Sequence, residues 1–99
     1  MRRIYNANIQ ITWGEAKRRL NLKNHGLDFL DAAAVFEGAT FTYEDDRHPY
    51  GEYRFITLGL LFGIPVSIAH TETRHEIRIL SFRKATSREA QIFFQSVPD

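Results

Sequence analysis

The sequence predicts one α+β domain, in which helices form a layer against a single sheet. Three observations lead to this prediction. The chain has 99 residues, too few to bury two independent cores. Apolar side chains recur with a helical period near both ends, at residues 15–36 and 86–94. Between these segments, residues 53–82 change to the β-branched and aromatic composition of strands.

The first third of the chain predicts a strand and two helices. Residues 8–13, NIQITW, alternate apolar and polar side chains, as a half-buried strand does. Residues 15–24 are helix-forming, and Gly26 supplies a stop signal. Asp28 is an N-cap candidate for a second helix, whose apolar side chains recur at i, i+3, i+4 and i+7 as far as Phe36. Because only a short turn joins these two helices, we expect a helix hairpin.

The remainder predicts strands and a final helix. A short strand is expected at 40–43, followed by a polar loop. Thr86 and Glu89 match the capping box of a C-terminal helix. The sequence therefore predicts an antiparallel-rich sheet of four or five strands with an N-terminal helix hairpin and a C-terminal helix. The longer strands are expected as a meander at residues 53–62, 66–71 and 75–82.

Composition limits the classes of function. No apolar run approaches the roughly 20 residues that span a bilayer, and the N-terminus lacks a signal-peptide pattern, so a cytoplasmic protein is expected. The chain has no cysteine, which removes thiol nucleophiles and agrees with a reducing compartment. Its four histidines match no metal-binding motif, so neither a metal nor another cofactor is expected.

The charges are divided along the chain although the net charge is only +1. Residues 1–27 contain six basic side chains and one acidic, whereas residues 28–53 contain seven acidic and one basic. Residues 54–99 contain six basic and four acidic side chains. If the two basic regions fold together, they form a face that attracts phosphates, and the acidic region can meet a basic protein. Solvated surfaces without a partner are equally compatible with the charges alone.

Three segments stand in order along the chain: ITWGEAKRRLNLKNHGLDFLDAAAVF at 11–36, GEYRFITLGL at 51–60 and HTETRHEIRILSFRKATSRE at 70–89. Together they resemble the BrnT family, a member of the RelE-like group of toxin–antitoxin ribonucleases. The resemblance implies a single RelE-like domain, 1–99, in which residues 1–8 are an N-terminal extension.

The resemblance implies a type II toxin that cleaves RNA without a metal and thereby inhibits translation and growth. It also implies neutralisation by a BrnA-like ribbon-helix-helix antitoxin, in a heterotetramer of two toxins and two antitoxins. The RNA could be free or ribosome-bound mRNA, and operator DNA would be contacted only through the antitoxin. An alternative is a non-catalytic module that binds RNA, the ribosome or the antitoxin, such as an inactivated toxin that acts in operon repression.

The implied reaction uses the 2′-hydroxyl of the RNA as nucleophile and needs a proton acceptor, a proton donor and cations at the phosphate. Arg83 is our first candidate cation, because it stands where a strand ends and a helix begins. Lys84 could share the phosphate, or donate a proton if its pKa is lowered. Arg78 lies five residues earlier and would face the opposite side of a regular strand, so it joins them only if the strand contains a bulge. Each could instead be a surface charge or an ion-pair partner.

His70 is the candidate for proton transfer, because a histidine can exchange a proton near neutral pH and this one ends an apolar strand where a cleft could open. A buried histidine with a structural hydrogen bond is an equally good interpretation. Glu72 is a weaker candidate base and could be an ion-pair partner. The candidate RNA-binding residues, some of which could merely be solvated, are Lys17, Arg18, Lys23, His25 and Arg54.

Overall fold

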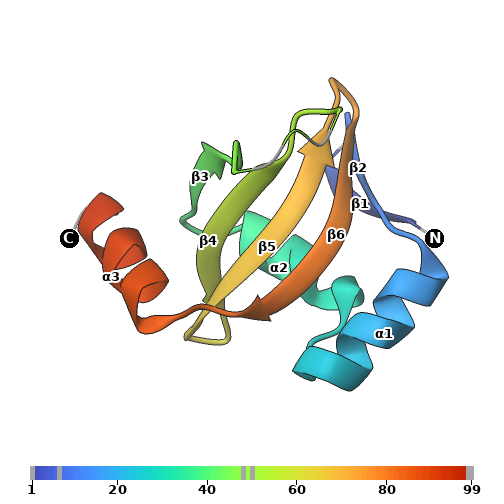
Figure 1. The fold of residues 1–99 in the computed structure, drawn as a ribbon. Helices are drawn as coiled ribbons and strands as arrows, with labels where there is room; N and C mark the ends of the chain where they lie inside the picture. Colours follow the sequence, from blue (N-terminus) through green and yellow to red (C-terminus); the bar gives the residue numbers. More distant parts are fainter. Residues whose placement is uncertain (1, 7, 48, 50, 98–99) are drawn as a thin grey trace.

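A single six-stranded sheet forms the centre of the computed structural model, which describes residues 8–47, 49 and 51–97, and the backbone of residues 2–6 (Figure 1). The predicted α+β class is confirmed, with one strand more than expected at the N-terminal edge. The strands, in sheet order, are β1 (Arg2–Asn6), β2 (Ile9–Thr12), β6 (Glu76–Lys84), β5 (Ile64–Glu72), β4 (Phe55–Leu61) and β3 (Phe41–Glu44). The helices are α1 (Glu15–His25), the 3₁₀ turn η1 (Phe29–Asp31), α2 (Ala32–Phe36) and α3 (Ser87–Ser96).

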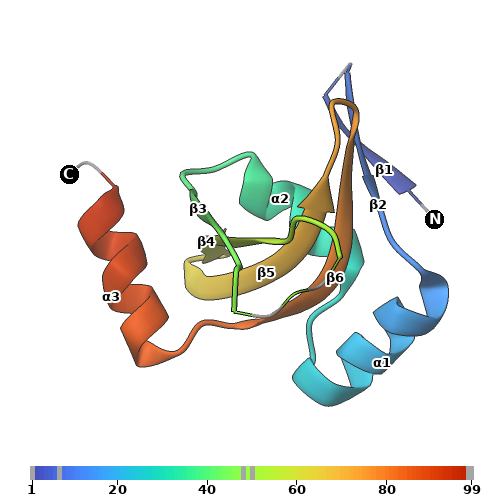
Figure 2. The same ribbon diagram turned by 45° about the horizontal axis from the view of Figure 1, so that its top comes forward.

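The sheet is mixed, because β2 runs parallel to β6 while the other neighbouring strands are antiparallel. β2 pairs only with residues 76–78 of β6. The later part of β6 therefore has no strand neighbour on that side, and α1 packs there instead. Figures 1 and 2 both place α1 and α3 at opposite ends of the sheet.

Each face of the sheet carries its own apolar cluster. Val66 and Ile68 of β5 belong to the larger cluster, which includes residues of η1 and α2 and also the buried Trp13. On the other face, Leu58 of β4 packs with Phe93 of α3. The helices are thus held by burial of apolar side chains on both faces. None of the described helices is long and apolar enough to cross a membrane.

The predicted helix hairpin is not confirmed. Gly26 ends α1 in the left-handed conformation with φ 72°, as expected for a helix stop. Asp28 does act as an N-cap, because its side chain accepts a hydrogen bond from Leu30 N. The segment it caps is split, however, into η1 and the short α2. α1 packs on β6, whereas α2 packs against β4 and β1. The two helices therefore contact different strands and do not pack on each other as a hairpin.

β6 contains a bulge opposite the middle of β5. Ser81 pairs with Ala69, but the next pair is Ile79 with His70, so Leu80 is an extra residue in β6. An extra residue reverses the alternation of side chains along the rest of a strand. This bulge decides which residues of β6 can share a face.

Candidate functional site

The bulge places two predicted site residues on one face of the sheet. Ile77 and Phe82 both belong to the larger core cluster although they are five residues apart. Arg78 and Arg83, one residue further along in each case, therefore both project from the opposite face. The bulge that Arg78 needs in order to share a face with Arg83 is therefore present in β6. The two arginines nevertheless stand about 15 Å apart along the strand.

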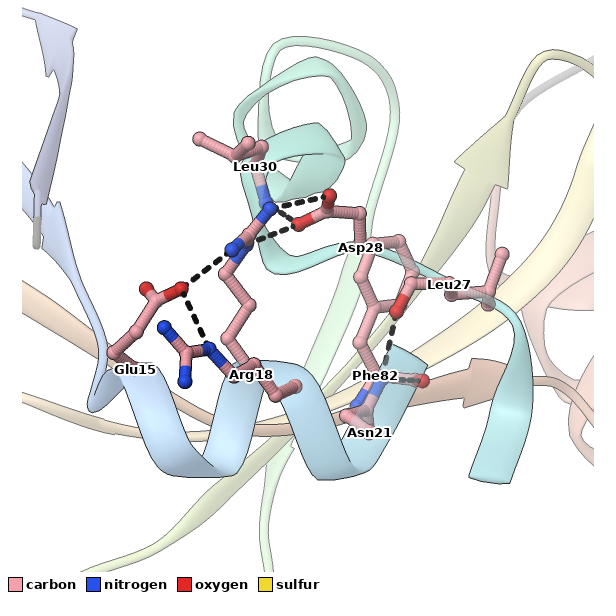
Figure 3. Close-up of polar contacts among 8 residues, drawn as sticks. Glu15, Arg18, Asn21, Leu27, Asp28, Leu30 and Phe82 are labelled. Atoms are coloured by element: carbon pink, nitrogen blue, oxygen red, sulfur yellow. Dashed lines mark hydrogen bonds and ion pairs between the residues drawn. The ribbon is translucent and has the colours of Figure 1, made fainter. Parts of the chain in front are cut away.

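Asn21 fixes α1 to the part of β6 that lacks a strand neighbour (Figure 3). Its Oδ1 accepts a hydrogen bond from Phe82 N at 3.0 Å, and its Nδ2 donates to Phe82 O at 2.7 Å. Nδ2 also donates to Leu27 O at 2.9 Å. The buried carboxamide thus replaces the missing strand for both backbone groups of Phe82, and it holds the helix at a fixed distance from β6.

Arg18, a predicted RNA-binding residue, has a structural position in the same region (Figure 3). Its Nε and Nη2 donate to the two carboxylate oxygens of Asp28 at 2.8 and 3.0 Å, and its Nη1 donates to Glu15 at 2.6 Å. The hydrogen bonds from Arg18 hold the pKa of the Asp28 carboxyl below its usual value. Because two carboxylates already surround this guanidinium, it is poorly placed to bind a phosphate.

A groove of about 230 Å³ lies between α1 and β6, and we call it the α1–β6 groove. Lys17 and His25, both predicted RNA-binding residues, line it. Lys23 is exposed but lies about 120° away from Lys17 around the helix, and it does not line the groove. None of the lining residues that the structure describes is a carboxylate, and Lys17 is a cation, so the groove is electrostatically suited to an anion. The described lining residues are Lys17, Leu20, Asn21, Asn24, His25, Leu80 and Ser81.

The guanidinium of Arg78, a residue of β6, lies beside the N-terminal end of α1. Its Nη2 stands 3.5 Å from the position that a Cβ on Gly14 would occupy. Gly14 is the N-cap of α1, less than one helical turn before Lys17. Arg78 is exposed and makes no ion pair with any residue that the structure describes. It is therefore a cation available near the groove.

Arg83 is engaged by a carboxylate of α3. Its Nη1 and Nη2 donate to Glu89 Oε1 and Oε2 at 2.7 and 3.1 Å. The Glu89 carboxylate also accepts from Thr86 N at 2.9 Å, within the capping box that the sequence predicted. Hydrogen bonding to Arg83 holds the pKa of the Glu89 carboxyl below its usual value. The sequence predicted Glu89 in the capping box, which the structure confirms. It gave no signal that the Glu89 carboxylate would also accept hydrogen bonds from Arg83.

The surroundings of Arg83 are acidic. It lines a hollow of about 170 Å³ with four carboxylates and one further arginine, which disfavours a phosphate there. A neighbouring hollow of about 420 Å³, which includes the predicted Arg54, also has four carboxylates. The charged residues of the first hollow are Glu44, Asp45, Asp46, Arg47, Arg83 and Glu89, and those of the second are Glu44, Asp45, Asp46, Glu52 and Arg54.

His70 is buried, not placed beside a cleft. Its side chain is 0% exposed, with Nε2 2.7 Å from Thr57 Oγ1 and its ring in edge contact with Phe36. Burial lowers the pKa of His70 to about 4. His70 pairs with Ile79 and faces the larger core, so it lies on the opposite face from Arg83. This geometry agrees with the interpretation of His70 as a buried histidine with a structural hydrogen bond, whose partner is the Thr57 hydroxyl.

The other two predicted catalytic residues lie at the ends of strands. Glu72 ends β5, with Oε1 3.5 Å from Nδ1 of His70, and is substantially exposed. Lys84 ends β6 and is exposed, opposite Val66 of β5. Neither residue lines the α1–β6 groove. The five predicted catalytic residues are thus not gathered at one place.

Taken together, these observations describe a small α+β protein with a groove between a basic helix and the edge of its sheet, lined by Lys17 and His25. The profile of a protein family described as "Ribonuclease toxin, BrnT, of type II toxin-antitoxin system" matches residues 13–89. The chain belongs to this family, and the resemblance stated from the sequence is confirmed. A toxin of a type II system implies an antitoxin partner.

A solved structure supports the same conclusion. The fold is similar to the crystal structure of the Brucella abortus ribonuclease toxin BrnT, with a TM-score of 0.64 and 26% sequence identity. The match covers 78% of this chain and 96% of the Brucella chain. No curated protein sequence matches the chain.

Proposed function

We propose that this chain is an endoribonuclease toxin whose RNA substrate binds in the α1–β6 groove. The observation that carries the proposal is that Lys17 and His25 line the groove and that no carboxylate is found among its lining residues in the described part of the chain. The ribonuclease toxins of the family supply the reaction class. The two acidic hollows around Arg83 and Arg54 argue against RNA binding there.

The groove offers a cation and a candidate base for the proposed reaction. The RNA 2′-oxygen attacks the adjacent phosphorus as its proton passes to a base, and the bond to the 5′-oxygen breaks as that oxygen gains a proton. The products are a cyclic phosphate and a 5′-hydroxyl. Lys17 and the nearby Arg78 stabilise the additional negative charge on the phosphorus oxygens. His25 is the described histidine in the groove, so we assign to it, in place of His70, the role of the base that accepts the 2′ proton, and a proton from solvent reaches the departing 5′-oxygen.

The family supports an antitoxin as the partner of this chain. We propose a RelE-like domain neutralised by a BrnA-like antitoxin in a 2:2 heterotetramer, acting on cytoplasmic RNA. A type II toxin requires such a partner, since unchecked cleavage stops growth. The acidic surface around Glu44 and Asp46 is separate from the groove, so a basic segment of an antitoxin could bind there independently of RNA.

Induction of the chain in the absence of an antitoxin tests the proposal. We expect growth arrest and new RNA fragments with 5′-hydroxyl ends, mapped by ligation that depends on prior phosphorylation. Lys17→Ala and His25→Ala should reduce cleavage at least tenfold, which is at the low end for loss of an acid–base group. Lys23→Ala removes a similar charge from outside the groove and is the matched control. Equal loss in all three variants, or none in the two groove variants, contradicts the proposed site.

A second candidate function is a non-catalytic module that binds RNA or the antitoxin. It is favoured by the dispersion of the predicted catalytic residues, because His70 is buried and Arg83 is held by Glu89. This candidate predicts that purified protein binds RNA but leaves it intact, and that its induction produces no new RNA ends. Cleavage that is lost in His25→Ala but retained in His70→Gln excludes it.

A further inference from the structure

Phe62 occupies a backbone conformation that does not suit it. It begins the two-residue turn between β4 and β5, where Leu61 pairs with Ile64. Phe62 has φ 50° and Gly63 has φ 82°, the pattern of a turn that favours Asn-Gly. Phe62 is the one residue other than glycine with positive φ in the described part of the chain.

Packing does not compensate for this strain. The Phe62 side chain belongs to a residue that is 84% exposed, so it gains little from burial within the chain. Strained residues without a structural reason are concentrated at binding and catalytic sites. An aromatic ring held out at the tip of a rigid hairpin is therefore a candidate contact for a ligand.

The surroundings of the tip point to RNA. The hairpin lies beside the end of β6, since Ala85 N donates to Pro65 O at 3.0 Å and Lys84 pairs with Val66. Lys84 makes no ion pair with a residue that the structure describes. An exposed ring at the tip of a hairpin and an unneutralised lysine that pairs with Val66, four residues after the ring, are the kinds of group that bind single-stranded nucleic acid, where bases stack on aromatics and cations hold phosphates.

The tip and the groove are connected by β6. Ser81 lines the α1–β6 groove, and Lys84 follows three residues later, about 10 Å along the strand. Ser81 pairs with Ala69 and Lys84 with Val66, so the two side chains project from opposite faces, and a single strand bound in the groove would reach Lys84 around the edge of β6.

We propose that Phe62 stacks on an unpaired base of the RNA, with Lys84 at the neighbouring phosphate. This inference rests on the proposed function and adds a base-contacting residue to it. It gives Lys84 the phosphate contact expected from the sequence, at a place away from the cleavage groove. The ligand is a single-stranded segment, because a base within a duplex does not offer a free face for stacking.

Binding of a short, unstructured 2′-O-methyl RNA tests the inference, since such a strand has no 2′-hydroxyl to react. We expect Phe62→Asn to bind it about ten- to hundredfold more weakly, the range for loss of one stacked base. The thermal midpoint of this variant should be equal to or higher than that of the wild type, because Asn suits the turn. Phe62→Trp should restore binding. Tyr53→Ala removes a ring that is 74% exposed in the acidic hollow and should leave binding unchanged.

Strands with a single abasic position distinguish stacking from an indirect effect. At one position the missing base should weaken binding by the wild type but not by Phe62→Asn. Wild-type affinity in Phe62→Asn, with weaker binding in Lys17→Ala, overturns this inference and leaves the proposed function standing. Loss of antitoxin binding in Phe62→Asn with unchanged RNA affinity shows a protein-docking tip and also overturns it. Failure of the wild type to bind RNA overturns both proposals.

Discussion

The burial of His70 predicts a specific dependence of stability on pH. Its pKa is lowered from 6.5 to about 4 in the folded chain because the ring is removed from water. Between these values the unfolded chain binds a proton at His70 and the folded chain does not. Stability is therefore full above pH 6.5 and falls as the pH decreases towards 4. At about 1.4 kcal/mol for each pH unit, the free energy of unfolding should decrease by about 3 kcal/mol across this window.

Urea unfolding can measure this decrease, with fluorescence of the single tryptophan, Trp13, as the signal. Trp13 is 2% exposed in the core and should report global unfolding. The wild type and His70→Gln are compared between pH 7.5 and 4.5. The carboxyls with lowered pKa, Asp28 and Glu89, are present in both proteins, so their contribution cancels in the difference.

The difference between the two proteins should change with pH in one direction. His70→Gln should be less stable than the wild type at pH 7.5, and the gap should close or reverse as the pH falls. Thr57→Val is the control, because it removes the hydrogen-bond partner 2.7 Å from Nε2 but keeps the titrating ring. It should lose stability at all pH values and retain the wild-type slope. A gap between wild type and His70→Gln that stays constant within about 0.5 kcal/mol would refute the reasoning.

Three further predictions concern α1, the sheet and the groove. Asn21→Ala should lower the free energy of unfolding by about 2–4 kcal/mol in urea, since both backbone groups of Phe82 lose their partner. Gly59→Ala should cost about 1–3 kcal/mol in thermal unfolding, because the new Cβ would lie 2.7 Å from Cγ1 of Val35, and Val35→Ala should recover part of this loss. Lys17→Ala should reduce the slope of log affinity against log salt for single-stranded RNA by about 0.7, whereas an unchanged slope would place Lys17 outside the RNA contact.

The elements of the fold could be predicted because their signals are local. The Thr86 and Glu89 capping box and the Gly26 stop involve residues within one helical turn. The alternation in residues 8–13 reflects burial of one face of β2. These patterns fix the type of each element without reference to the rest of the chain. The confirmed family resemblance also rests on the sequence alone.

The candidate site could be predicted only in part. Lys17 lies on the helix expected at 15–24, and His25, one residue beyond the expected end, is the last residue of α1. Nothing in the sequence indicated that Lys23 would lie outside the groove formed with β6. The sequence offers Arg83 as a candidate cation at the phosphate and Arg18 as a candidate RNA-binding residue. The structure pairs them with carboxylates of other segments, which spacing along the chain does not reveal.

The sequence by itself determined the α+β class, the types of the main elements, the family and the candidate residues. The tertiary structure alone decided which of those residues share a surface. A single extra residue at Leu80 turns Arg78 to the same face as Arg83, while pairing with Ile79 turns His70 into the core. Element types depend on neighbours within about four residues. The direction of a strand side chain depends on register with a distant strand, and one bulge changes it for every residue that follows.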